Sequence, residues 1–167
     1  MIKPFKLLLI LLLPVSLFAQ DTAIVKKQAN GVAKALMNSD FKRVIAGTYP
    51  KAVDIAGGKE KLLSMMTAGM SQMRSQGFSF QKVTIGSPGK FYKAGTEIHC
   101  LLPETIVMKT SRGLMAAKSN LLAISNDKGK NWTFIDLNER AISSIKTLFP
   151  NFNKNLVIPA PTLPVML

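Results

Sequence analysis

The sequence predicts an α+β domain in which N-terminal helices pack on a curved, cone-like antiparallel sheet of four to five strands, followed by a C-terminal helix and an extended tail. Apolar residues recur at helical spacing as far as Gly77, and from Phe78 to Leu137 they alternate at strand spacing. Short turns join the strands, which indicates antiparallel pairing because parallel neighbours need long crossovers. Helices that precede such a sheet are typical of an α+β fold with the helices in its concavity.

Residues 1–20 have the pattern of a signal peptide. Lys3 and Lys6 give a positive start, and the apolar run Leu7–Leu13 follows. The apolar core is shorter than the roughly 20 residues that span a bilayer, so we expect cleavage near Gln20 and no stable membrane anchor. We therefore expect an exported protein, in the periplasm or outside the cell, and the alternative is an uncleaved N-terminal anchor. Residues 21–149 form one domain by length, and residues 150–167 form a tail.

The chain is strongly basic, with 22 Lys and Arg residues against 9 Asp and Glu residues. Loss of Lys3 and Lys6 with the leader lowers the formal net charge from +13 to +11. The remaining bases are scattered as pairs and singles, without an arginine-rich stripe or interleaved aromatics. We therefore expect no nucleic-acid partner and a solvated surface, and weak contact with an anionic envelope stays open.

Cys100 is the only cysteine, so no internal disulfide can form. Ile98, Leu101 and Leu102 surround it, which favours a buried side chain in a strand, and an intermolecular bridge is the alternative. The only histidine, His99, is its neighbour, and neighbouring residues of a strand point to opposite faces. The two residues cannot share a simple metal site, so we expect no metal and no cofactor.

Two helical patterns begin the mature chain. The first covers residues 22–38, with Val25, Ala29 and Leu36 on one stripe. The second covers Phe41–Ala46, and we expect Ser39 or Asp40 to cap it by accepting hydrogen bonds from the free N–H groups of its first turn.

A third helix is predicted at Lys59–Ser75. Segment 51–56 lies before it, between Tyr49-Pro50 and Gly57-Gly58, and Gly77 ends the helix. Methionines recur along its apolar face together with Leu62 and Leu63. Thioethers are soft metal ligands, but unbranched side chains among leucines favour core packing or the apolar wall of a pocket.

The strands are predicted in the following order: Phe78–Ile85, Thr96–Pro103, Glu104–Thr110, Leu114–Ser125 and Trp132–Leu137. The alternation in the first strand changes parity between Phe80 and Val83, which indicates a bulge. The fourth strand is long, so it must curve or twist to stay packed on a small domain.

The C-terminal part contains a predicted helix at Glu139–Phe149, which ends at Pro150. Three prolines break the apolar tail that follows, which excludes a helix and favours an extended path. We expect this tail to pack along the domain or along a second subunit, and a disordered tail is the alternative.

Several segments also resemble a known family. The chain resembles exported bacterial members of the nuclear transport factor two-like superfamily, which is also called cystatin-like or SnoaL-like. The resemblance lies in the stretch from Thr48–Val53 through Gly57–Glu60, in the strands that follow and in the ending Gly129–Asp136. The resemblance covers about residues 22–137. It implies a cone-shaped fold, often dimeric, with a pocket between the helices and the concave face of the sheet. Some members are isomerases, dehydratases or cyclases, and many bind ligands or proteins without catalysis.

No residue is assigned a catalytic or metal-binding role, but several are candidates for lining such a pocket. These are Tyr49, Asp54, Met66, Met70, Met73, Tyr92 and Trp132. Glu104 and His99 are further polar candidates. If Ile98 and Cys100 face the core, His99 lies on the other face of the sheet, at a dimer interface or in solvent.

We therefore expect an exported, non-catalytic binding module with an apolar pocket for a small hydrophobic ligand or with a protein partner, and we expect a homodimer. One alternative is an isomerase or lyase of a small hydrophobic substrate, with Tyr49 as a donor and Asp54 as a base. Another alternative is a structural protein that contacts other envelope proteins. That role would predict a filled interior with no pocket.

Overall fold

The computed structural model describes residues 17–160 and 162–167, so most of the predicted signal peptide lies outside the described residues. The N-terminal half contains helices α1 (Leu17–Met37), α2 (Phe41–Ala46), α3 (Pro50–Ile55) and α4 (Lys59–Ser75). The rest contains strands β1 (Ser79–Ile85), β2 (Tyr92–Ala94), β3 (Glu97–Thr110), β4 (Gly113–Ser125) and β5 (Thr133–Asp136), then α5 (Glu139–Ser143), α6 (Ile145–Leu148) and β6 (Val165–Met166).

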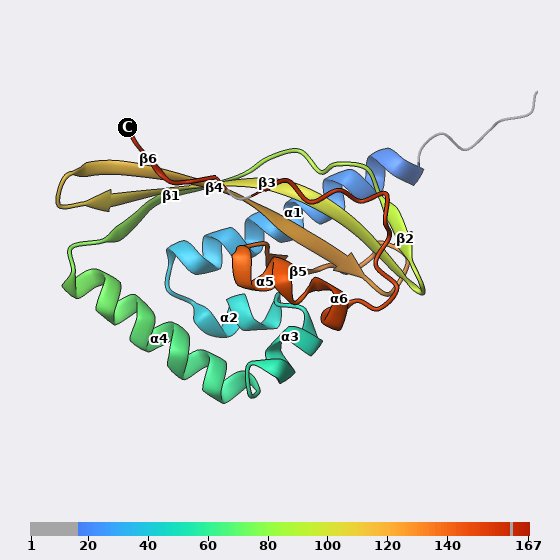
Figure 1. Cartoon of the computed structure of the whole chain (residues 1–167), viewed down its shortest axis with the longest axis horizontal. Helices are drawn as coiled ribbons and strands as arrows, with labels where there is room; N and C mark the ends of the chain where they lie inside the picture. Colours follow the sequence, from blue (N-terminus) through green and yellow to red (C-terminus); the bar gives the residue numbers. More distant parts are fainter. Residues whose placement is uncertain (1–16, 161) are drawn as a thin grey trace, which may run out of the picture.

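The fold is the predicted α+β arrangement, with the helices before a curved antiparallel sheet (Figure 1). Six strands form the sheet in the described part of the chain. Its main path runs β1-β3-β4-β5, while the short strands β2 and β6 pair with β3 and β4. The predicted bulge is present, because the register between β1 and β3 shifts between Phe80 and Lys82.

The predicted boundary between strands at Pro103 and Glu104 is wrong, because β3 continues through both residues. The carbonyl of Pro103 accepts a hydrogen bond from the N–H of Gly86, directly after β1 ends. A residue in an antiparallel pair directs its nitrogen and its carbonyl toward the same neighbour. The proline nitrogen therefore faces the end of β1, and pairing of β3 with β4 is not interrupted.

The two faces of the sheet are covered by different parts of the chain. Helix α1 packs on one face, which we call the helix face, with Val25 and Ala29 against Leu102 and Leu121. On the opposite, outer face, a separate cluster forms under α6 and the segment after it. Its buried members are Leu122, Ile124, Ile135, Leu137, Leu148, Phe149 and Leu156.

The predicted C-terminal helix is divided into α5 and α6. The N–H of Ser144 bonds the carbonyl of Ala141, three residues back, which makes a tight turn and ends the α-helical ladder. After α6 the tail packs along its own domain. Leu156 is buried in the outer cluster, and β6 pairs with Met115 and Ala116 of β4.

Helix α4 is held away from the sheet. None of its residues is buried, and Met65 is 54% exposed. Figure 1 shows α4 set apart from the strands, with α2 between it and α1. Its apolar side chains are therefore half-buried or exposed rather than packed on the sheet.

Substitution of Leu156 by Ala will measure how firmly the C-terminal segment is anchored. Leu156 is 4% exposed within the outer cluster, so truncation should lower the free energy of unfolding by about 2–4 kcal/mol. Its neighbour Val157 is 77% exposed, and Val157→Ala should change it by less than about 0.5 kcal/mol. Urea unfolding of both variants makes the comparison. Equal effects would show that the segment does not pack as described.

Candidate functional site

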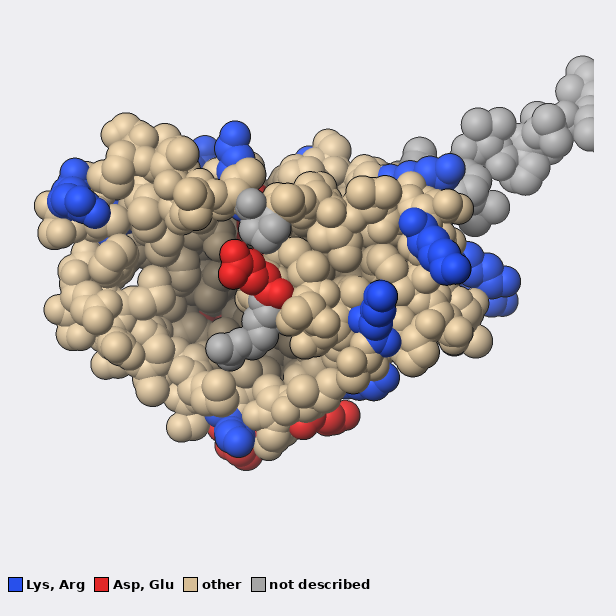
Figure 2. Space-filling model, viewed as in Figure 1, with Lys and Arg blue, Asp and Glu red and all other residues tan. Residues whose placement is uncertain are grey.

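A cavity of about 670 Å³ lies between the helices and the helix face of the sheet. Figure 2 shows a hollow that opens to solvent on one side of the molecule, with a wall that is mostly neither acidic nor basic. Its volume falls within the range of about 300–1,000 Å³ typical of small-molecule sites. The cavity is therefore large enough to enclose a small ligand.

Apolar side chains from several helices form the walls of this cavity. Among them are Val32, Leu36, Ile55, Leu62, Met65 and Met66. Helices α1 and α4 contribute most of these, because α4 stands off the sheet and leaves its apolar stripe uncovered. An apolar wall of this kind favours a hydrophobic ligand.

The floor of the cavity is acidic. Glu104 of β3 and Asp136 of β5 both line it. Ser119 of β4 lies directly opposite Glu104, and its hydroxyl donates to Glu104 Oε2 at 3.2 Å. Asp136 pairs with Leu121, two residues beyond Ser119, so all three polar side chains share the helix face.

The pKa values of both acids are raised, chiefly by burial. Burial, followed by the charge of Asp136, raises the pKa of Glu104 from 4.5 to about 7, although the Ser119 hydrogen bond opposes this. Burial also raises the pKa of Asp136. Glu104 is only 6% exposed, whereas Asp136 lines the same cavity and is exposed. No Lys, Arg or His among the described residues lines the cavity.

The structure places the seven predicted pocket residues in different surroundings. Met66 lines the large cavity, but Met70 and Met73, further along α4, do not. Tyr49 and Asp54 line a separate cleft of about 370 Å³, because α3 turns them away from the large cavity.

The two remaining pocket candidates are packed elsewhere. Trp132 lies in the core, where its indole Nε1 donates to the carbonyl of Gly129 at 2.9 Å. Tyr92 packs at the edge of the outer cluster, because β2 lies at the edge of the sheet.

Asp136 was not among the predicted residues, although a signal for it exists in the sequence. Phe134 and Asp136 are two residues apart in a strand, so they share a face, and Phe134 is an obvious core residue. An acid two residues from a core aromatic in the same strand indicates a polar group on an apolar face. Glu104, which is two residues from Leu102, carries the same signal.

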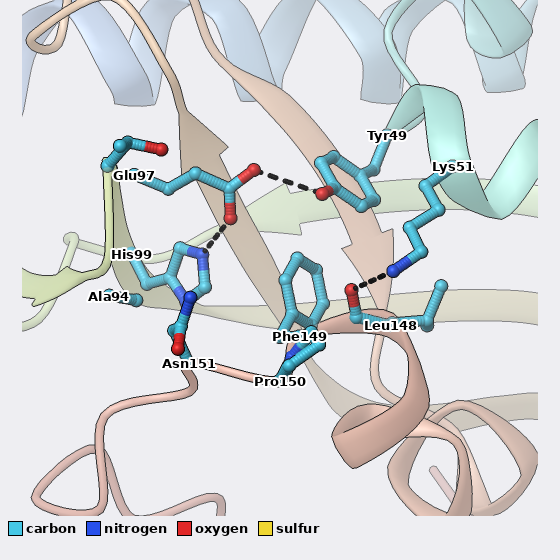
Figure 3. Close-up of a pocket in the computed structure, with 10 residues that line it drawn as sticks. Tyr49, Lys51, Ala94, Glu97, His99, Leu148, Phe149, Pro150 and Asn151 are labelled. Atoms are coloured by element: carbon cyan, nitrogen blue, oxygen red, sulfur yellow. Dashed lines mark hydrogen bonds and ion pairs between the residues drawn. The ribbon is translucent and has the colours of Figure 1, made fainter.

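A second polar group lies on the outer face. Tyr49 Oη donates to Glu97 Oε1 at 3.0 Å, and Glu97 Oε2 lies 3.0 Å from His99 Nε2. Figure 3 shows Glu97 between the two rings, with Lys51 directed at the carbonyl of Leu148. The cleft beside this chain of contacts has a volume of only about 170 Å³.

His99 lies on the face opposite α1, as the alternation predicts, but its expected place at a dimer interface or in solvent is wrong. The ring is fully buried under the chain's own C-terminal segment, with its centroid 4.8 Å from that of Phe149 and 5.8 Å from that of Phe152. The prediction placed no segment over His99 because the sequence does not show that the C-terminal segment packs on this face of the sheet.

Burial shifts the pKa values of His99, Tyr49 and Cys100 toward their neutral forms. It lowers the pKa of His99, although the Glu97 carboxylate partly offsets this. Burial and Glu97 raise the pKa of Tyr49 to about 12. Burial likewise raises the pKa of the Cys100 thiol to about 12, and Cys100 points to the helix face. No thiolate is therefore available to His99, and the Tyr49–Glu97–His99 chain is best explained as a packing element.

Other features bear on broad function classes. No three or more His, Cys, Asp or Glu side chains among the described residues are grouped to hold a metal ion. None of the described helices is long and apolar enough to cross a membrane.

The chain matches no protein-family model, and no curated protein matches it either. Membership of the nuclear transport factor two-like superfamily therefore stays a prediction.

The raised pKa of Glu104 predicts a pH dependence of stability. Between about pH 4.5 and pH 7 the folded protein keeps a proton on Glu104 that the unfolded chain has lost. Stability present below that window is therefore lost as the pH rises through it, by at most about 3 kcal/mol. Glu104→Gln stays neutral and should remove this loss.

Chemical denaturation across this pH range tests the prediction, with Glu60→Gln, an exposed acid of α4, as the matched control. Parallel curves for the wild type and Glu104→Gln would contradict it.

The single histidine makes the outer site measurable by NMR. Because the Glu97 carboxylate raises the pKa of His99 against the effect of burial, Glu97→Gln should lower that pKa further. A titration followed at the imidazole C–H resonance gives the value directly. Tyr49→Phe keeps the carboxylate and should shift the pKa less. A pKa that rises in Glu97→Gln would show that the contact is absent in solution.

Proposed function

We propose that this chain is an exported, non-catalytic binding protein that takes a small hydrophobic ligand into the cavity between α4 and the sheet. The single observation that carries the proposal is the cavity of about 670 Å³ with apolar walls. A well-formed apolar cavity with a few convergent polar groups is the usual form of a small-molecule site. A purely structural role predicts a filled interior instead, so the cavity argues against that alternative.

The fold also supports a relation to the nuclear transport factor two-like superfamily, which we retain as part of the proposal. Helices before a curved antiparallel sheet, with a cavity between them, agree with what that resemblance implies. Export and a homodimeric state belong to the same proposal. Exposed apolar side chains near the C-terminus, including Leu163 and Leu167, offer a surface for a second subunit.

An isomerase or lyase is the second candidate, and Glu104 is the observation that favours it. A carboxyl with a pKa of about 7 in an apolar cavity suits proton transfer at neutral pH. Tyr49 and Asp54, the residues expected to act as donor and base, do not line this cavity. Any such chemistry would therefore use Glu104 and Asp136 instead.

Filling the cavity tests the proposal directly. Ala56 lines the cavity, so Ala56→Trp should obstruct it and weaken binding of the uncharged dye N-phenylnaphthylamine at least tenfold. The dye should brighten when the wild type encloses it. Ala68→Trp introduces the same side chain at an exposed position of α4 and should bind like the wild type.

Absence of dye binding to the wild type, or equal binding by both variants, would overturn the proposal. The same preparation tests its other parts, since the exported protein should begin near Gln20 and have the mass of a dimer.

A further inference from the structure

The acidic floor is out of keeping with the rest of the cavity. Glu104 and Asp136 approach from β3 and β5, and the neutral hydroxyl of Ser119 contacts both acids. A buried carboxylate costs free energy unless a cation or several hydrogen bonds compensate its charge. No Lys, Arg or His among the described residues of the lining supplies that cation.

Within the described lining, the two acidic side chains favour an occupant that brings a positive charge. An anionic ligand, such as a fatty acid, would place a third negative charge beside two carboxyl groups and would be repelled. A neutral ligand would be stabilised only by its contacts with the apolar walls. A ligand with a protonated nitrogen would be stabilised by the apolar walls and by the acidic floor. Its ammonium would donate charge-assisted hydrogen bonds to the two carboxylates.

We propose that the cavity selects a small hydrophobic amine, with its ammonium group between Glu104 and Asp136 and its hydrocarbon part against α1 and α4. This inference rests on the proposed function, because it requires that the cavity binds a ligand at all. Val32 and Leu36 of α1 and Met66 of α4 provide the contacts for the hydrocarbon part. Methionine side chains adapt to ligands of varied shape, so the selectivity lies at the acidic floor.

The pH should modulate this selection. The titratable groups of the described lining are Glu104 from β3 and Asp136 from β5, and Ser119 from β4 lies beside them. An alkylamine stays protonated over the whole range in which these acids titrate. Its binding should therefore strengthen as both carboxyl groups lose their protons, and binding of an uncharged analogue should not.

Three probes of equal chain length test the proposal by isothermal titration calorimetry: decylamine, decanol and decanoate. Near pH 8 the wild type should bind decylamine about tenfold more tightly than decanol, with decanoate weakest, which corresponds to one charge-assisted contact. Glu104→Gln and Asp136→Asn should each lose most of this preference and still bind decanol. Near pH 5 the preference of the wild type should shrink.

Glu60→Gln removes the same charge from an exposed site of α4 outside the lining, and it should keep the preference for the amine. Equal affinity for all three probes, or a preference that survives in both floor variants, would overturn the amine proposal while decanol binding upheld the proposed function. Failure of every probe and of the naphthylamine dye would overturn both.

Discussion

The register of the β3–β4 hairpin is the constraint on which both polar sites depend. The two strands pair without interruption from Ile98 with Ser125 to Thr110 with Gly113. Alternation along β3 then sends Leu102 and Glu104 toward the helices and His99 toward the outer face. A slip of one residue would exchange the two faces. The acidic floor of the cavity and the buried histidine are therefore consequences of one register.

The cavity exists because α4 packs on α2 and α3 rather than on the sheet. Gly57 and Gly58, both with positive φ, turn the chain into the helix, and Gly77, also with positive φ, turns it out toward β1. Arg74 donates to Ser39 Oγ at 2.7 Å, which ties the end of α4 to the turn between α1 and α2. A helix fixed in this way can leave its apolar face open without losing its place in the fold.

Local signals explain how much of this fold the sequence predicts. The bounds of α4 agree with the prediction because Gly58 and Gly77 punctuate the chain, and Asp40 caps α2 as expected. Helix α3 is predicted only as a segment between Pro50 and Gly57. The sequence does not predict β2 or β6, because pairing of two or three residues depends on distant contacts. Alternation marks Glu104 and Asp136 as acids on core faces of their strands, but it does not show that they are neighbours, because strand pairing alone brings β3 and β5 onto either side of β4.

The two polar sites differ in whether the described chain supplies partners for their acidic side chains. On the outer face, Glu97 meets donors from Tyr49 and His99, so its charge is compensated within the chain. In the cavity, two acids face each other across a hydroxyl, and the described lining offers no base. Apolar residues at those positions would pack at lower cost. A cost in stability that the fold does not require is typical of a binding site, where the compensating group arrives with the ligand.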